Sequence, residues 1–246
     1  MHTPPVLLVI AHGSRDPRHA ATVHALVREA RAQRPGVRVE TAFLDFSVPS
    51  VPGVLESLAA EGVRDVVALP LLLTRAFHAK SDIPSVLRAA PPSLRIRQAG
   101  VLGPSPLLLT ALDRRLYEAG LTPADKPTTG VVLASAGSSD PEAIAVIADI
   151  AREWRHTGWC AVRPAFASAR LPRTEDAVRE LRALGCARVA VAPYVLAPGR
   201  LPDRIARGAA GADVLSAVLG PAPEVARVLL RRYQEALVRE LATASA

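Results

Sequence analysis

The sequence is poor in cysteine, methionine and aromatic residues, and it has no long apolar run. Of its 246 residues two are cysteine and 4% are aromatic, whereas 50% are hydrophobic. So few cysteines exclude a disulfide scaffold, and apolar runs such as 66–73 fall well short of the ~20 residues that a membrane helix needs. The first residues lack the basic segment and cleavage site of a signal peptide. We therefore expect a globular cytoplasmic protein with buried, unpaired thiols at Cys160 and Cys186.

Basic residues outnumber acidic ones by 30 to 23, which gives a net charge of +7. Nearly all of them are arginine, since Lys80 and Lys126 are the only lysines. They are spread over helix-like stretches, and no aromatic residues alternate with them to stack on bases. We therefore interpret most of them as solvated helix faces and expect neither a nucleic acid nor a membrane as partner. A small polyanionic ligand suits the charge equally well.

The chain contains an internal repeat. Residues 9–17 (VIAHGSRDP) are echoed by residues 133–141 (LASAGSSDP), and residues 66–73 by residues 189–196. A third pair, Val-Leu-Gly-Pro at 101–104 and 218–221, keeps the same order. The repeat predicts two lobes of one topology, residues 1–121 and 129–246, joined by the proline-containing stretch 120–129.

Each half alternates short β-rich runs with amphipathic helical ones. In the first half we expect strands near 6–11, 37–44, 66–73 and 96–101, and helices near 17–34, 50–62, 82–90 and 105–119. Parallel neighbours need helical crossovers, so this order is typical of a parallel sheet covered on both faces. The sequence therefore predicts an α/β protein of two doubly wound lobes, each a four-stranded, mainly parallel sheet flanked by helices. We expect a cleft between the lobes.

Three metal-ligating side chains follow the first three predicted strands: His12, Asp45 and His78. Ligands of such sheets bind outside the carboxyl ends of the strands, so these side chains converge if the first strand lies between the second and third. Two imidazoles and a carboxylate suit a borderline divalent metal and leave coordination positions open. Each residue alone has an ordinary explanation as a hydrogen-bonded loop residue. Their convergence favours a site.

The second half acts as an internal control for these three residues. Ala136 stands in the place of His12 and Ser168 in the place of Asp45, and Pro198-Gly199-Arg200 replaces the segment that carries His78. The Gly-Ser-x-Asp-Pro turn is nevertheless kept. Residues needed for folding should recur in both halves, so the joint loss indicates a chemical role for the first-half residues.

Other polar residues have two open interpretations. The segment 13–15 (Gly-Ser-Arg) opens a helix, whose first N–H groups either hold an anion or form an ordinary capping turn. Some basic residues either line the cleft or are solvated, namely Arg75, Lys80 and Arg200. His19 and His24 are expected on the first helix as packing or solvent-facing residues, His2 at a frayed terminus and His156 at an exposed helix end.

Taken together, the motifs resemble a known family, the class II tetrapyrrole chelatases of the sirohydrochlorin ferrochelatase and cobaltochelatase type. The resemblance depends on residues 11–17 (AHGSRDP), on 42–45 (AFLD) followed by Pro49-Ser50, and on 70–73 (PLLL) running into His78 and residues 82–84 (DIP). The degenerate second half is similar to the long, two-domain members. Asp45 departs from the family pattern, which often has glutamate at that position.

The resemblance implies insertion of Fe²⁺ or Co²⁺ into sirohydrochlorin without ATP, in sirohaem or cobalamin biosynthesis. The metal is then a substrate, no cofactor is permanently bound, and we expect a monomer. By the resemblance His12 and His78 are catalytic and bind the metal with Asp45, while the substrate contacts come from Gly13, Ser14, Arg15, Ser47 and Lys80. Imidazole, with a pKa near ~6.5, can both ligate a metal and accept a pyrrole proton.

Two alternatives stay open at this point. A non-catalytic carrier of metal or tetrapyrrole needs the same ligands as a chelatase. A histidine phosphatase also places a His-Gly turn after its first strand, but it requires an arginine directly before the histidine, where this chain has Ala11.

Overall fold

The computed structural model describes residues 4–75 and 82–244, and it divides into two compact units. The first unit contains one four-stranded parallel sheet with the strand order β2-β1-β3-β4. Its elements are β1 (Val6–Ala11), α1 (Pro17–Gln33), β2 (Val39–Phe43), α2 (Val51–Ala60), β3 (Asp65–Pro70), α3 (Ile83–Arg88), β4 (Arg95–Gln98) and α8 (Pro223–Ala244). Strand β1 therefore lies between β2 and β3, as the proposed convergence of side chains requires.

The second unit repeats this topology with the strand order β6-β5-β7-β8, again all parallel. Its elements are α4 (Pro106–Glu118), η2 (Pro123–Thr128), β5 (Thr129–Ser135), α5 (Pro141–Arg155), β6 (Ala161–Phe166), α6 (Thr174–Ala183), β7 (Arg188–Tyr194), α7 (Arg200–Gly208) and β8 (Val214–Leu215). The α/β class and the two four-stranded parallel sheets predicted from the sequence are confirmed.

The first helix of each repeat begins at the signal that the sequence carries. The Asp16 carboxylate accepts the N–H of Arg18 at 2.9 Å, directly before Pro17. The Asp140 carboxylate accepts the N–H of Glu142 at 3.0 Å, directly before Pro141. An acidic cap accepts an N–H group that has no partner within the helix. Proline fits the first turn because it has no N–H, and the N–H groups of that turn have no partner within the helix.

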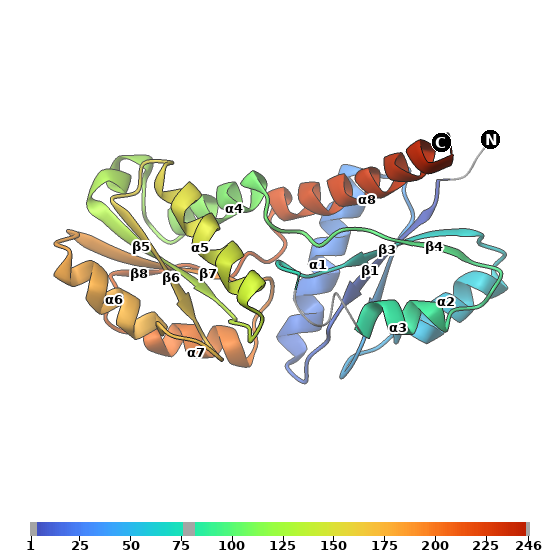
Figure 1. Ribbon diagram of the computed structural model, residues 1–246, viewed down its shortest axis with the longest axis horizontal. Helices are drawn as coiled ribbons and strands as arrows, with labels where there is room; N and C mark the ends of the chain where they lie inside the picture. The colour runs from blue at the N-terminus through green and yellow to red at the C-terminus, as the bar shows by residue number, and fades with distance from the viewer. Residues whose placement is uncertain (1–3, 76–81, 245–246) are drawn as a thin grey trace. The chain divides into compact units, whose positions relative to one another are not determined.

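In the first unit, helices cover both faces of the sheet. Helices α2 and α3 pack on one face, where Leu55, Leu58 and Ile83 join alternate residues of β1 in one buried cluster. The connection from β1 to β2 runs across the sheet in one direction, and those from β2 to β3 and from β3 to β4 run in the opposite direction. Because such connections are right-handed, α1 lies on the face opposite to α2 and α3. Helix α8 contacts α1 and β3 and completes that layer; Figure 1 shows α8 in red crossing one end of α1 in blue.

The packing units do not coincide with the expected sequence repeats, residues 1–121 and 129–246. One unit comprises Met1–Ser105 with Pro221–Ala246, and the other Pro106–Gly220. The last helix of each sequence repeat therefore packs with the other unit. Both helices are amphipathic, so the apolar pattern alone leaves open which sheet each one covers.

Polar contacts fix α8 to the first unit. The Arg232 guanidinium donates to the carbonyl oxygens of Val101 at 2.8 Å, Leu102 at 3.0 Å and Pro104 at 3.0 Å. The buried Tyr233 hydroxyl donates to the carbonyl oxygen of Pro5 at 2.7 Å.

A corresponding network fixes α4 to the second unit through Asp113. One carboxylate oxygen accepts the indole N–H groups of Trp154 at 2.8 Å and Trp159 at 3.1 Å. The other oxygen accepts the Lys126 ammonium at 2.5 Å, and that ammonium also lies 5.1 Å from the centre of the Trp159 ring. Both tryptophans of the chain therefore report on the second unit.

The prediction that both thiols are buried is only half right. Cys160 and Cys186 are free, as expected, but Cys160 is exposed while Cys186 is buried. Cys160 directly precedes β6, which is an edge strand, so only one neighbouring strand covers it. Within the described residues, no helix combines the length and apolar character needed to cross a membrane.

Candidate active site at the end of the first strand

His12 follows β1 directly, and the turn that holds it depends on Gly13. Gly13 has φ +94°, a left-handed conformation that glycine adopts without strain. A Cβ atom at this position would lie 1.7 Å from the carbonyl oxygen of Asp45. Glycine is therefore required for two reasons, the backbone conformation and the close passage of the loop after β2.

The loops after β1 and β2 are joined by hydrogen bonds. The N–H of Asp45 donates to the carbonyl of His12 at 2.9 Å, and the N–H of Leu44 donates to that of Ala11 at 3.0 Å. The Ser47 hydroxyl donates to the carbonyl of Ser14 at 3.2 Å and accepts the Ser14 N–H at 3.4 Å. The structure thus brings together five of the eight residues that sequence analysis assigned to the site: His12, Gly13, Ser14, Asp45 and Ser47.

Phe46 lies beside the expected site residues, and sequence reasoning did not select it. Its side chain is 61% exposed and its φ is +60°, so the ring stands out from the loop. The His12 ring lies 6.2 Å away in an edge arrangement, and the Arg15 guanidinium lies 5.3 Å from the ring centre. Phe46 therefore links a sixth expected residue, Arg15, to His12. The available signal was an aromatic residue in a turn of a chain that has only four phenylalanines.

The two histidines of α1, His19 and His24, pack against the buried Phe43 ring. The ring centres of His24 and Phe43 are 5.8 Å apart, and those of His19 and Phe43 are 6.4 Å apart. Packing was the expected role of both. Burial lowers the pKa of His19, and the charge of His12 lowers it further, so the two imidazoles interact electrostatically. This coupling was not predicted.

The start of α1 forms a capping turn. The N–H of Asp16 donates to the Ser14 hydroxyl at 3.1 Å, and the Asp16 carboxylate occupies the positive end of the helix. Hydrogen bonds from the Arg18 side chain and backbone lower the pKa of Asp16, which keeps that end negatively charged. Of the two open interpretations, the structure supports the capping turn. Any anion binding here then depends on the Arg15 side chain.

Two of the expected site residues, His78 and Lys80, lie outside the described residues. Arg75 is described and exposed. Within residues 4–75 and 82–244, no three His, Cys, Asp or Glu side chains come together to hold a metal. The described part of the expected ligand set therefore consists of His12 and the exposed Asp45.

The second unit repeats the backbone of this turn without the side chains of His12, Asp45 and Phe46. Gly137 has φ +88°, and a Cβ there would lie 2.1 Å from the carbonyl oxygen of Ser168. The Ser168 N–H donates to the carbonyl of Ala136 at 3.0 Å, as Asp45 does to His12. Ala169, with φ +61°, stands where Phe46 stands in the first unit. The turn is thus common to both copies, whereas His12, Asp45 and Phe46 occur only in the first, which is the pattern expected of residues that carry chemistry.

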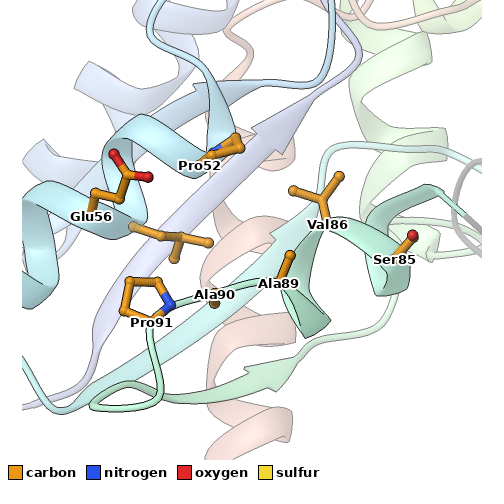
Figure 2. Close-up of a pocket in the computed structure, with 8 residues that line it drawn as sticks. Pro52, Glu56, Ser85, Val86, Ala89, Ala90 and Pro91 are labelled. Atoms are coloured by element: carbon orange, nitrogen blue, oxygen red, sulfur yellow. The ribbon is translucent and has the colours of Figure 1, made fainter.

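A separate pocket of about 270 Å³ lies between α2 and α3. Figure 2 shows the Glu56 carboxylate and the Ser85 hydroxyl at opposite sides of this pocket, with apolar side chains between them. Its lining contains one carboxylate and no histidine, so it offers no set of metal ligands. None of the expected site residues lines it.

The CbiX family pattern matches the chain twice, over residues 6–119 and 130–236. The chain belongs to the CbiX family. The two matches correspond to the two sequence repeats, so the last helix of each CbiX repeat is the one that packs with the other unit.

Curated relatives of this CbiX protein include two bacterial chelatases. The sirohydrochlorin cobaltochelatase of Priestia megaterium is 31% identical over 208 residues, which cover 81% of this chain and 66% of the relative, just under two thirds. The sirohydrochlorin ferrochelatase of Bacillus subtilis is 29% identical over 241 residues, which cover 93% of this chain and 90% of the relative.

Two solved structures share the fold over nearly the whole chain. SirB from Bacillus subtilis with Fe³⁺ matches with a TM-score of 0.80 and 27% identity, and the match covers 94% of this chain and 95% of SirB. The sirohydrochlorin chelatase SirB from B. subtilis subspecies spizizenii, in complex with cobalt, matches with a TM-score of 0.77 and 25% identity over 94% of each chain.

Proposed function

We propose that this CbiX protein inserts a divalent metal, Fe²⁺ or Co²⁺, into sirohydrochlorin, in sirohaem or cobalamin biosynthesis. The observation that carries the proposal is the His12 turn, which two loops hold in place and which only the first copy equips with functional side chains. The names of the relatives agree with it, since they include both a cobaltochelatase and a ferrochelatase acting on sirohydrochlorin. Two unpaired thiols fit the reducing cytoplasm, where we place the reaction.

In the proposed reaction the dication replaces two pyrrole N–H protons, so the site must deliver a metal and remove two protons. We assign both tasks to His12 and His78, because a neutral imidazole nitrogen can bind a metal or accept a proton. Asp45 supplies a third, charged ligand from the neighbouring loop. Few protein ligands leave coordination positions open, and the metal can then pass to the pyrrole nitrogens. The assignment of His78 follows from the sequence, because that residue lies outside the described part of the chain.

Substrate binding is proposed around the same turn. The many carboxylates of sirohydrochlorin need cations, which Arg15 and Lys80 supply, while Ser14 and Ser47 offer hydroxyls and Gly13 lets the two loops that carry them pass close together. The exposed Phe46 ring adds an apolar surface beside His12 on which the flat macrocycle can lie. The positive net charge of the chain favours arrival of this anionic substrate.

A turnover experiment tests the proposal. Purified protein is mixed with an excess of sirohydrochlorin and with Fe²⁺, Co²⁺ or Ni²⁺ without ATP, and metallation is followed by visible absorption. We expect many metallated products per protein chain with Fe²⁺ or Co²⁺, at initial rates well above the rate without protein. Metallation that stops at one equivalent would instead identify a carrier. Rates equal to the protein-free control would refute the proposal.

A further inference from the structure

The two cysteines of the second unit lie in contact. The Sγ atoms of Cys160 and Cys186 are 3.9 Å apart, although the residues are 26 positions apart in the sequence. Cys160 directly precedes β6 and Cys186 lies just before β7, and these two strands flank β5. The thiols therefore meet at the edge of the sheet where the strands begin.

The space in which they meet is left by Gly130 of β5. A Cβ atom on Gly130 would lie 2.7 Å from Cys186 Sγ and 2.9 Å from a methyl carbon of Leu181, both closer than such atoms approach. Any larger residue would displace the Cys186 sulfur. The absence of a side chain at Gly130 thus allows the Cys186 sulfur to lie over the central strand, beside Cys160.

The two thiols differ in access to solvent. Cys160 is exposed, whereas Cys186 is buried. Burial raises the pKa of Cys186, and its hydrogen bond with Cys160 raises it further. An oxidant in solution therefore reaches Cys160 first, and Cys186 stays a protonated thiol beside it.

We propose that Cys160 and Cys186 form a modification site at which a peroxide produces a reversible intrachain disulfide. The Cys160 thiolate attacks one oxygen of hydrogen peroxide, which breaks the O–O bond, and a proton taken up by the departing oxygen gives water and a sulfenic acid. The Cys186 sulfur then attacks the Cys160 sulfur, displaces its oxygen as a second water and forms the S–S bond. Overall two thiols and one peroxide give one disulfide and two waters, so the thiols lose two electrons and the peroxide gains them.

This site is independent of the proposed chelatase function. Both cysteines precede their strands, whereas His12 and its counterpart Ala136 follow theirs, at the opposite edge of their own sheets. Closing the disulfide adds no group to the turn after β1. We therefore expect the oxidised protein to metallate sirohydrochlorin at the rate of the reduced protein, within about twofold.

The test treats the fully reduced chain with increasing hydrogen peroxide and measures free thiols, intact mass and peptide linkage. We expect both thiols to disappear together, the mass to fall by two hydrogens, and a peptide pair joined through Cys160 and Cys186. Dithiothreitol should restore both thiols. A disulfide that closes a loop of this length should also raise the melting temperature of the second unit, by roughly 10 °C.

Two single variants identify the order of events. In Cys186→Ser, the exposed Cys160 should gain oxygen and accumulate sulfenic and then sulfinic acid, because no neighbouring thiol resolves it. In Cys160→Ser, the buried Cys186 should react at least tenfold more slowly. Separate oxidation of the two thiols in the parent protein, or disulfides formed only between chains, would overturn the proposal.

Discussion

Gly13 is the residue on which the shape of the proposed site depends. It has a left-handed backbone conformation, and the carbonyl oxygen of Asp45 occupies the position that a side chain would take. The close passage lets the N–H of Asp45 reach the carbonyl of His12. A single residue thus determines both the direction of the chain after β1 and its distance from the loop after β2.

Replacing Gly13 should therefore lower the free energy of unfolding more than replacing a left-handed glycine normally does. We expect Gly13→Ala to lower the free energy of unfolding by roughly 3 kcal/mol or more, because backbone strain and the clash with Asp45 add. Gly62→Ala is the matched control: Gly62 has φ +80° and open space around it, so its replacement should cost only about 1 kcal/mol. Chemical denaturation of both variants measures the difference, and equal losses would show that the Asp45 contact is unimportant.

Phe46 should contribute to substrate binding and little to stability. Phe46→Ala removes an exposed ring, and the second unit already has alanine at this place with nearly the same φ, +61° against +60°. We expect the free energy of unfolding to change by less than about 0.5 kcal/mol and KM for the tetrapyrrole to rise roughly 2–10-fold. Steady-state metallation kinetics test this. An unchanged KM would exclude Phe46 from the binding surface.

His19 should make stability depend on pH just below neutrality. Burial lowers its pKa in the folded protein below the ordinary value of 6.5. As pH falls below 6.5 the unfolded chain binds a proton that the folded chain does not, so stability is lost toward the folded pKa. His19→Gln should remove this slope when the free energy of unfolding is measured from pH 8 down to pH 5.5. Parallel curves for parent and variant would contradict the assignment.

Among the elements, α4 and α8 are the two helices whose packing unit differs from their sequence repeat. Each is the last helix of its own repeat and packs on the sheet of the other. Helix α8 is held by the three carbonyl contacts of Arg232, and α4 by the Asp113 network, which includes both tryptophans.

Because α8 packs in the first unit, a substitution that removes its contacts should destabilise that unit. Arg232→Ala should lower the stability of the first unit by about 2 kcal/mol, because it removes three charged hydrogen bonds. Unfolding followed by circular dichroism should then begin earlier, while the tryptophan fluorescence midpoint stays in place. Arg231→Ala, which removes only an exposed pair with Glu235, is the control and should cost less than about 0.5 kcal/mol. A matching shift of the fluorescence midpoint in Arg232→Ala would place α8 in the second unit.

At this scale the sequence predicted most of the fold. Alternating apolar runs and the Asp-Pro helix starts placed all four strands and four helices of the first half within a few residues of their observed bounds. The strand order was only a condition of the expected convergence, and the structure shows that the condition is met, with β1 between β2 and β3. The partner of each last helix did not follow, because an apolar helix face fits either of two similar sheets, and only side-chain contacts such as those of Arg232 distinguish them.

At the scale of the whole molecule, the internal duplication distinguishes residues needed for folding from residues proposed to carry chemistry. Both copies keep the glycine turn and the hydrogen bond across it, at 2.9 Å and 3.0 Å, and only one keeps the histidine and the carboxylate. This comparison within one chain allowed His12 and Asp45 to be selected from the sequence. The position of Phe46 beside His12 and the charge coupling of His19 to His12 depend on loop conformation and burial, which no residue pattern in the sequence encodes. The roles of His12, Asp45 and His78 all stay predictions.

The central claim is that His12 takes part directly in metallation, and the most direct measurement is the rate of metal insertion by His12→Ala. We expect the rate to fall at least 100-fold, with unchanged circular dichroism, because the side chain follows β1 and the turn is held by backbone contacts. His156→Ala, at an exposed histidine of the second unit, should retain the parent rate. A His12→Ala variant that folds normally and metallates sirohydrochlorin within a few-fold of the parent rate would contradict the claim.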